Sequence, residues 1–416
     1  MLIYMLFVIV GLFLSDADDL QYLVQTNPEE AVQVISDKPD LNEDAELLYL
    51  LGSAHYHLWQ YERAVTQLEK SIELDPENIA ANVQLGQAYR SLGRVNDAYS
   101  TFSEILEQDP DHYEATVFLA DLSLQMGNYE QSGDLYDRLI ERDEGNSRYH
   151  QKRAEVYQAT DSLSKAVESY ETAHMLNPSG LSIMYELARL YYQLDEVADA
   201  AEIIDLALDT YDESGRLWHE QGRIQYAMGN REYAAHSYNK AIEYGKNDAA
   251  TWRNKGMAYL FSEQLSEALE ALDTSLSKND EDPKTAFYLG MALADRDQHD
   301  AALSHFELAT DLQYDELLRE TQTQKAVLLS DINRKDEAIT LYRRTIDMWP
   351  EQEDLVFHLA RLYDEYYEDR SIPLNYYEDY LALETGDTQL ESYAEQRIRV
   401  LKREIHMEEG RTEDNP

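Results

Sequence analysis

One residue type recurs at a fixed interval through most of this chain. Alanine occupies positions 34 residues apart, with serine at one interruption and a last step of 36 residues: Ala64, Ala98, Ser132, Ala166, Ala200, Ala234, Ala268, Ala302 and Ala338. A constant interval of this length is typical of a repeat architecture, in which each copy buries its apolar face against the next. The sequence therefore predicts a stacked array, whose size is not limited in the way that a single globular core is.

Each repeat carries two stripes of apolar and small residues with helical spacing. When Ala45 is counted as position 1, the stripes fall on positions 4, 7, 8, 10, 11 and 14, and on positions 17, 20, 21, 24, 27 and 28. Glycine separates them at Gly93, Gly127 and Gly229, because it tolerates the left-handed conformation at a helix end. Proline follows the second stripe, as at Pro76, and cannot continue a helix. The pattern predicts two antiparallel helices per repeat.

The small residues have a steric role in this pattern. Glycine or alanine at position 8 and alanine at position 20 are expected to let the two helices of one repeat approach closely. Position 24 is expected to fill the space toward the next repeat: Leu68, Phe102, Tyr136, Tyr170, Ile204, Tyr238, Leu272 and Phe306. Position 7 is polar in four repeats, at Arg153, Gln221, Lys255 and Lys325. Either their long stems pack well at a half-exposed position, or these side chains contact another repeat or a ligand.

These positions resemble the tetratricopeptide repeat family, whose pattern has small residues at positions 8, 20 and 27, aromatic residues at 11 and 24, and proline at 32. The resemblance extends from Ala45 to about Glu384. It implies an all-α fold, a right-handed α-solenoid (superhelix) of stacked antiparallel helix hairpins. Because each hairpin buries a face against its neighbour, N- and C-terminal capping helices are expected.

The repeats divide the chain into segments. Eight contiguous repeats fill residues 45–316, a ninth fills 317–352, and a divergent tenth fills 353–384. In the tenth, Ile372 stands before Pro373, which predicts a broken or shifted second helix. An N-terminal capping segment is expected in 18–44, with its helix near Pro28–Ser36. A C-terminal capping helix is expected in 385–409, followed by a tail in 410–416, and its apolar face would be Leu390, Tyr393, Ile398, Leu401 and Ile405.

Residues 1–17 begin with an apolar run from Met1 to Leu14. This run is shorter than the roughly 20 residues that span a bilayer, and its length suits the core of a signal peptide. Ser15 and Ala17 supply the small residues of a cleavage site, although no Lys or Arg precedes the core. We expect an exported, periplasmic or envelope-associated protein. An uncleaved anchor, a start codon placed too late, or a buried helix in a cytoplasmic protein are the alternatives, and membrane association is expected through residues 1–14 only.

The charge of the chain is strongly negative, with 82 acidic and 35 basic residues and a formal net charge of −47. Such a polyanion repels nucleic-acid phosphates and anionic lipids, so a nucleic-acid partner is not expected. The acidic surface is interpreted either as a solvated surface suited to a saline habitat or as a surface for a basic partner.

No residue pattern indicates catalysis, a cofactor or a metal. The chain has no cysteine, which excludes disulfides, thiol catalysis and Cys-zinc sites. It also has no nucleophile elbow, Walker loop, dinucleotide-binding glycine cluster or zincin motif. His55 and His57 lie two residues apart on a predicted helix and point to different faces. We therefore expect a non-enzymatic protein without cofactors.

The resemblance also implies a binding surface, because first helices of the family line a concave groove through positions 2, 5, 6, 9, 12 and 13. In the fourth to eighth repeats, the groove residues chosen from these positions are Arg148, Lys152, Tyr185, Arg189, Tyr192, Arg216, His219, Arg223, Tyr226, Arg253, Asn254, Lys284, Phe287 and Tyr288. Seven are basic, against four acidic residues at the same positions: Glu155, Glu186, Glu220 and Asp295. This local balance is opposite to that of the whole chain.

Arginine offers a planar fork for carboxylates, and aromatic side chains offer rigid contact area. We therefore expect the groove to bind an acidic or carboxylate-bearing peptide or protein. The alternative is that the arginines pair with acidic residues of adjacent first helices. The clamp with which some family members hold chaperone C-termini is incomplete here, although Arg253 and Asn254 occupy two of its positions.

The leading hypothesis is a protein–protein interaction scaffold. A self-assembling structural factor of an envelope complex and a regulatory accessory subunit of a catalytic partner are the alternatives. The sequence leaves the oligomeric state open.

Overall fold

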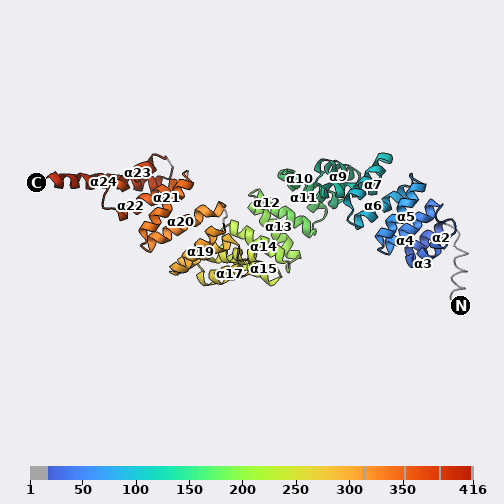
Figure 1. The fold of residues 1–416 in the computed structure, drawn as a ribbon, viewed down its shortest axis with the longest axis horizontal. Helices are drawn as coiled ribbons and strands as arrows, with labels where there is room; N and C mark the ends of the chain where they lie inside the picture. Colours follow the sequence, from blue (N-terminus) through green and yellow to red (C-terminus); the bar gives the residue numbers. More distant parts are fainter. Residues whose placement is uncertain (1–16, 313–314, 351–352, 384–385, 414–416) are drawn as a thin grey trace. The chain divides into compact units, whose positions relative to one another are not determined.

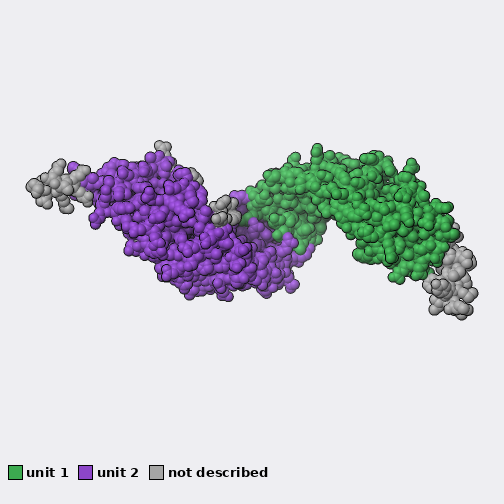
Figure 2. Space-filling model, in the orientation of Figure 1, with its two compact units in different colours: residues 1–194 green, residues 195–416 purple. Residues whose placement is uncertain are grey.

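The computed structural model describes residues 17–312, 315–350, 353–383 and 386–413, which form helices joined by short turns (Figure 1). No strand occurs in these four ranges. The chain divides into two compact units, residues 1–194 and 195–416 (Figure 2). The apolar run Met1–Leu14, which we expect to be a signal peptide or anchor, lies outside the described residues.

The helices follow the repeats. The first compact unit contains α2 (Ala17–Thr26), α3 (Pro28–Ser36), α4 (Ala45–His57), α5 (Tyr61–Leu74), α6 (Ile79–Ser91), α7 (Val95–Gln108), α8 (Tyr113–Gln125), α9 (Tyr129–Arg142), α10 (Ser147–Ala159), α11 (Leu163–Leu176) and α12 (Leu181–Gln193). The second contains α13 (Val197–Thr210), α14 (Gly215–Ala227), α15 (Arg231–Glu243), α16 (Ala249–Leu260), α17 (Leu265–Lys278), α18 (Pro283–Ala294), α19 (His299–Asp311), α20 (Asp315–Asp331), α21 (Lys335–Met348), α22 (Glu353–Tyr366), α23 (Ser371–Leu381) and α24 (Thr388–Glu413).

Consecutive helices pack as antiparallel hairpins within each compact unit, for example α4 with α5 and α16 with α17. The second helix of one repeat packs on the first helix of the next, as α5 does on α6 and α15 on α16. First helices also contact one another, α4 with α6 in the first unit and α14 with α16, α16 with α18 and α18 with α20 in the second. The expected fold class, an all-α solenoid of stacked hairpins with capping helices, is thereby confirmed in each unit.

The recurring small residues allow the close approach of the two helices of a repeat. Ala64, Ala98 and the corresponding alanines are fully buried, and Ser132 in the same position donates a 3.0 Å hydrogen bond to the Ala120 carbonyl. A methyl group added at Gly52 would lie 2.7 Å from the Leu68 side chain and 3.3 Å from the Ala64 carbonyl. In the first repeat, position 8 therefore has no space for a side chain unless Leu68 shifts.

The large residue at position 24 packs on its own repeat as well as on the next, whereas the sequence predicted only the second contact. The ring of Phe102 covers Gly86 in the same repeat, and a methyl group added there would lie 2.6 Å from that ring. The ring also stacks on Phe118 of the following repeat, with centroids 4.9 Å apart. One side chain thus joins three helices, α6, α7 and α8.

The turn within each repeat requires a residue with positive φ. Gly93, Gly127 and Gly229 adopt it, as the sequence predicted, with φ of 72°, 80° and 85°. Aspartate, glutamate or asparagine takes the same place in most other repeats, but Trp59 occupies it in the first, with φ of 62° and an 80 % exposed side chain. For a residue with a large side chain this conformation costs roughly 1–2 kcal/mol.

The polar side chains at position 7 make contacts between repeats. Arg153 donates two hydrogen bonds, of 2.6 and 2.9 Å, to Asp137, which is position 25 of the preceding repeat. Two further pairs connect the same positions, Gln221 with Asp205 at 2.7 Å and Lys325 with Glu307 at 3.0 Å. In the seventh repeat, Lys255 instead lies over the Trp252 ring, 4.4 Å from its centroid. These residues contact a neighbouring repeat in three of the four cases, which favours the second interpretation of position 7.

The N-terminal cap contains two helices. Helix α3 spans Pro28–Ser36 and has the bounds expected from the sequence. Helix α2 was not expected, because its apolar stripe is short. It buries Leu20 and Val24 in a cluster that also includes Ile35 of α3 and Leu51 of α4.

The tenth repeat and the C-terminal cap depart from the regular pattern. The second helix, α23, begins only at Ser371, so Pro373 lies in its first turn, where a missing N–H costs nothing. This is the shifted helix that the sequence predicted. Helix α24 buries Ile398 and Leu401 as expected, but Tyr393 is 45 % exposed, whereas the adjacent Ala394 is fully buried in the core. The helix also continues to Glu413, beyond the predicted end of the cap at residue 409.

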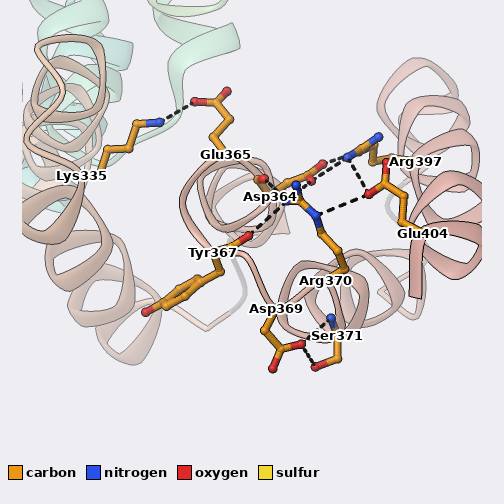
Figure 3. A network of polar contacts seen from close by, with 9 residues as sticks. All are labelled: Lys335, Asp364, Glu365, Tyr367, Asp369, Arg370, Ser371, Arg397 and Glu404. Carbon is orange, nitrogen blue, oxygen red and sulfur yellow. Dashed lines mark hydrogen bonds and ion pairs between the residues drawn. The ribbon is translucent and has the colours of Figure 1, made fainter. Parts of the chain in front are cut away.

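An ion-pair network holds the cap in place (Figure 3). Asp364 of α22 accepts two hydrogen bonds from Arg397 of α24, of which the Nη2 bond measures 2.8 Å. Arg370, which precedes α23, lies 3.7 Å from the same carboxylate and 3.4 Å from Glu404 of α24. The side chain of Asp364 is only 9 % exposed, so its charge is balanced by these two arginines.

Candidate functional site

The residues predicted to line a groove lie on the first helices of five successive repeats, and they belong to two compact units. In the first unit, α10 carries Arg148 and Lys152, and α12 carries Tyr185, Arg189 and Tyr192. In the second unit, α14, α16 and α18 carry the others: Arg216, His219, Arg223, Tyr226, Arg253, Asn254, Lys284, Phe287 and Tyr288. Each unit is therefore considered separately.

Most of the predicted basic residues form ion pairs with carboxylates of first helices or of the turns before them. The pairs are Arg148–Asp121 at 2.9 Å, Lys152–Glu155 at 2.7 Å, Arg189–Glu186 at 2.8 Å, Arg223–Glu220 at 2.7 Å and Arg253–Asp282 at 2.7 Å. Arg216 and Lys284 also have interaction partners. Asp121 and Asp282 were not among the acidic residues counted from the sequence. The positive residues thus stand in alternation with acids and do not form an uninterrupted basic strip.

Two predicted groove residues belong to the packing between helices. Phe287 is only 3 % exposed, because its ring packs against Phe306 of α19, with centroids 6.0 Å apart. His219 lies against Tyr238 of α15 and has its Nδ1 3.0 Å from the Thr251 hydroxyl on α16. Burial lowers the pKa of His219 to about 4, so its imidazole is neutral at pH 7.

Arg148 differs from the other paired cations because it lines a pocket in the first compact unit. The pocket has a volume of about 220 Å³ and lies between α8 and α10, with walls that include Tyr113, Val117, Phe118 and Tyr149. The Arg148 side chain is 60 % exposed, more than those of Lys152, Arg189, Arg223 and Arg253 in their ion pairs. A small apolar group can enter this pocket with a polar end beside the guanidinium.

The Asp121 carboxylate, itself held by the Tyr136 hydroxyl, fixes the orientation of the Arg148 guanidinium. Asp121 accepts a hydrogen bond from Arg148 through one carboxylate oxygen and from the Tyr136 hydroxyl through the other. Only Nη2 of the guanidinium takes part in this bond, and a guanidinium has five N–H donors in a fixed fork. The wall of the pocket also carries cations on its aromatic rings, with Arg90 4.5 Å from the Phe118 centroid and Arg142 4.8 Å from that of Tyr113.

The second compact unit contains a row of aromatic side chains. Tyr226 of α14, Phe261 at the end of α16 and Tyr288 of α18 meet edge to face, with centroids 6.4 and 6.2 Å apart. Phe261 is 45 % exposed, and Arg231 lies 3.7 Å above the Tyr226 ring. Burial raises the pKa of Tyr226 and of Tyr288, so both hydroxyls stay protonated at neutral pH. Tyr226 and Tyr288 were predicted as site residues, and Phe261 was not.

Sequence reasoning missed several residues that complete these surfaces. Phe118 and Val117 occupy positions 6 and 5 of the third repeat, which face the groove in the family pattern, but only the fourth to eighth repeats were considered. Phe261 occupies position 13 of the seventh repeat. An apolar aromatic residue at a groove position was the signal that would have identified Phe118 and Phe261.

The described residues contain no group of three or more histidine, aspartate or glutamate side chains placed to hold a metal ion. Nor do the helices in those ranges include one whose length and apolar character would suffice to cross a lipid bilayer.

Several solved structures resemble this chain at low sequence identity. A chain of the APC/C hetero-tetramer Cut9–Hcn1 is 14 % identical, and the match covers 92 % of this chain and 90 % of that one with a TM-score of 0.47. Yeast Tom70 is 16 % identical, with coverages of 95 % and 99 % and a TM-score of 0.43. YrrB, whose structure is described as a TPR protein with an unusual peptide-binding site, is 22 % identical, with coverages of 45 % and 95 % and a TM-score of 0.39.

No curated protein sequence matches the chain. Family profiles described as tetratricopeptide repeat match residues 45–78, 90–156, 159–224 and 253–314. These ranges together cover more than half of the chain and fall within the segment of the first eight repeats, with most of α6 and all of α15 outside them. The chain therefore belongs to the tetratricopeptide repeat family, and it is a protein–protein interaction scaffold of the kind this fold provides.

Proposed function

We propose that this scaffold binds a carboxylate-bearing peptide segment of a partner protein, and that the pocket at Arg148 receives the carboxylate. The observation that carries the proposal is an exposed, oriented guanidinium that lines a pocket whose wall is partly apolar. Arginine binds carboxylates through paired N–H donors, and hydrogen bonds of this charged kind are worth roughly 1.5–3 kcal/mol.

The charges around the pocket favour a single carboxylate over a polyacidic segment. Asp121 already neutralises part of the Arg148 charge, and the Glu114 side chain belongs to the pocket wall. A run of acidic residues would meet these groups and the net charge of −47. A peptide C-terminus with one small apolar side chain satisfies the pocket better, because Val117 and Phe118 can contact that side chain while the terminal carboxylate reaches Arg148.

The proposal is tested with an array of peptides that have free C-termini, followed by fluorescence anisotropy on the tightest binder. We expect Arg148→Gln to weaken binding of that peptide by about 10- to 100-fold, which corresponds to the loss of one or two charged hydrogen bonds. The same peptide with an amidated C-terminus should bind wild-type protein as weakly as the free acid binds the variant.

Arg94→Gln is the matched control. Arg94 is another exposed arginine of the first compact unit with one carboxylate partner, Asp97 at 2.6 Å, and it lies outside the pocket. Its replacement removes the same charge and should leave the affinity unchanged. Equal binding of acid and amide, or an equal loss in both variants, would show that Arg148 does not receive the carboxylate.

Export to the cell envelope is part of the same proposal and rests on the sequence of residues 1–17 alone. Fractionation of cells that produce the full chain, with mass spectrometry of its N-terminus, tests it. A chain found in the cytoplasm with an intact N-terminus would contradict export and would leave the peptide proposal standing.

A further inference from the structure

A second cavity, in the second compact unit, has a chemistry opposite to that of the Arg148 pocket. It lies between α18, the turn after it, α19 and α20, and it has a volume of about 560 Å³. This size is within the range of roughly 300–1,000 Å³ that is usual for ligand pockets. Met291, Val327 and Ile332 contribute apolar wall, and Asp295, Asp297 and Asp331 contribute carboxylates.

The repeat pattern explains why a cavity occurs at this place. Position 12 carries a longer side chain in each of the first seven repeats, namely Tyr56, Arg90, Leu124, Gln158, Tyr192, Tyr226 and Leu260. In the eighth repeat the same position is Ala294, which lines the cavity. The first helices of the eighth and ninth repeats, α18 and α20, contact each other directly. The short side chain of Ala294 therefore leaves space between them.

The carboxylates also follow from the repeat register. Position 13 is aspartate in the eighth and ninth repeats, at Asp295 and Asp331, and is not acidic in any of the first seven. Asp295 directly follows α18, Asp331 is the last residue of α20, and both line the cavity. Asp297 joins them from the turn, where it adopts the positive φ of 60° that this position requires.

These charges have no counterion within the described parts of the chain. Asp295, Asp297 and Asp331 form no ion pair with another described residue, in contrast to the paired acids at Arg148, Arg223 and Arg253. His299 also lines the cavity, and its Nδ1 atom is buried without a hydrogen-bond partner among the described residues. Burial raises the pKa of Asp295, as expected for a carboxylate that lacks a neighbouring cation. Arg296, the one basic residue of this turn, does not line the cavity.

We propose that this cavity is a docking site for a lysine or arginine side chain of a partner protein, whose aliphatic stem lies against Met291, Val327 and Ile332 and whose charged end reaches Asp295 and Asp331. Lysine and arginine bury an apolar stem while they hold the cationic end near solvent or a carboxylate. The half-apolar wall and the three unpaired carboxylates match both parts of such a side chain.

The site differs in place and in charge from the one proposed for a carboxylate at Arg148. Either can fail without the other, because the ligands, the variants and the compact units are different. The overall charge of −47 attracts any cation, so the experiment must separate docking in the cavity from general attraction.

The experiment uses the full chain with ¹³C-methyl-labelled methionine and follows the Met291 methyl signal by NMR, a method suited to weak ligands. The probe is Nα-acetyl-lysine methylamide, and the matched probe is Nα-acetyl-norleucine methylamide, which has the stem without the charge. We expect a saturable shift of Met291 with the lysine probe and a much weaker response with the norleucine probe. The Met407 methyl signal should not move with either.

Three variants complete the test. Asp295→Asn combined with Asp331→Asn should weaken the lysine probe by about tenfold or more. Ala294→Tyr should have a similar effect without a change in charge, because it restores the long side chain that three other repeats accept as Tyr56, Tyr192 and Tyr226. Asp300→Asn removes a charge from α19 at a residue that does not line the cavity, and it should leave the affinity unchanged.

The proposal is overturned if the norleucine probe binds as well as the lysine probe, since the carboxylates would then have no role. An equal loss in Asp300→Asn would show general attraction, and a lack of saturation would show that no site exists. The thermal midpoint of each variant, measured in the same samples, separates loss of binding from loss of fold.

Discussion

At the scale of single residues, His219 shows how packing between repeats determines protonation. The imidazole lies between α14 and α16, with the Thr251 hydroxyl 3.0 Å from Nδ1 and the Tyr238 ring against its face. Burial disfavours the cation and lowers the pKa to about 4, with a smaller contribution from Lys246. A histidine of this kind stabilises the folded chain only while it stays neutral.

The consequence is a pH-dependent loss of stability. The folded-state pKa of about 4 is below the unfolded value of about 6.5, so the unfolded chain binds more protons between these values. The contribution is present above pH 6.5 and is lost as the pH falls toward 4. Between pH 7 and pH 5, wild-type protein should lose about 2 kcal/mol more of unfolding free energy than His219→Gln does. Hydrogen exchange of α14 and α16 at both pH values measures this difference.

His57→Gln provides the comparison for this prediction, because His57 is exposed on α4 in the other compact unit. Its loss should not alter the pH dependence of α14 and α16. If His219→Gln and wild type respond equally to acid, another group controls the acid sensitivity of these helices.

At the scale of helices, the C-terminal cap depends on the buried carboxylate of Asp364. Arg397 is one of its two partners, and the pKa of Arg397 is raised mainly by that hydrogen bond. Replacement of Arg397 by glutamine leaves a nearly buried charge beside Arg370 alone. Loss of one partner from a buried ion pair costs about 3–5 kcal/mol. We expect Arg397→Gln to remove most of the hydrogen-exchange protection of α24.

Lys402→Gln tests whether burial is the cause. Lys402 of the same helix pairs with Glu378 of α23 at 2.7 Å, but both side chains are about half exposed. Exposed pairs contribute about 0–1 kcal/mol, so protection of α24 should change little. If both variants lose protection to the same extent, the network in Figure 3 does not hold the cap.

Much of the helical architecture could be predicted because it depends on spacing. The interval of the alanines, the glycines at three turns and the proline after some hairpins give the helix pairs, and the bounds of α3 and the shift of α23 followed from local residues. Helix α2 was not predicted, because its apolar stripe of Leu20, Leu23 and Val24 spans little more than one turn. Its stability comes from contacts with α3 and α4 that only the fold reveals.

The candidate site could be predicted less well, because a helical period gives the face on which a residue lies but not its partner. Arg253 was placed correctly on α16, yet its partner Asp282 is the last residue of the same repeat, which caps the N-terminus of α18 and has no groove position. Phe287 has a groove position by count, but its ring turns toward Phe306 in the core. The cavity at Ala294 results from a side chain that is missing, which becomes apparent only when equivalent positions of all repeats are compared.

At the scale of the whole molecule, the net charge of −47 dominates the long-range electrostatic energy of the folded chain. Ion pairs balance part of it locally, but the excess of acidic residues repels itself in the folded chain. Salt screens this repulsion over a distance of about 10 Å at 0.1 M. We expect sodium chloride to raise the thermal midpoint by several degrees. Sucrose at matched osmolality should have a smaller effect, and an equal effect would show that charge repulsion does not limit stability.

The contacts between position 7 of one repeat and position 25 of the repeat before it limit which repeats such a chain can gain or lose. Each junction has its own chemistry: a guanidinium with a carboxylate at Arg153–Asp137, an amide at Gln221–Asp205, and an ammonium at Lys325–Glu307. Removal of the fourth repeat would take Arg153 away and set Leu187 of the fifth against Asp137. A carboxylate facing leucine loses its hydrogen bonds, so the contacts between adjacent repeats constrain the order and number of the hairpins.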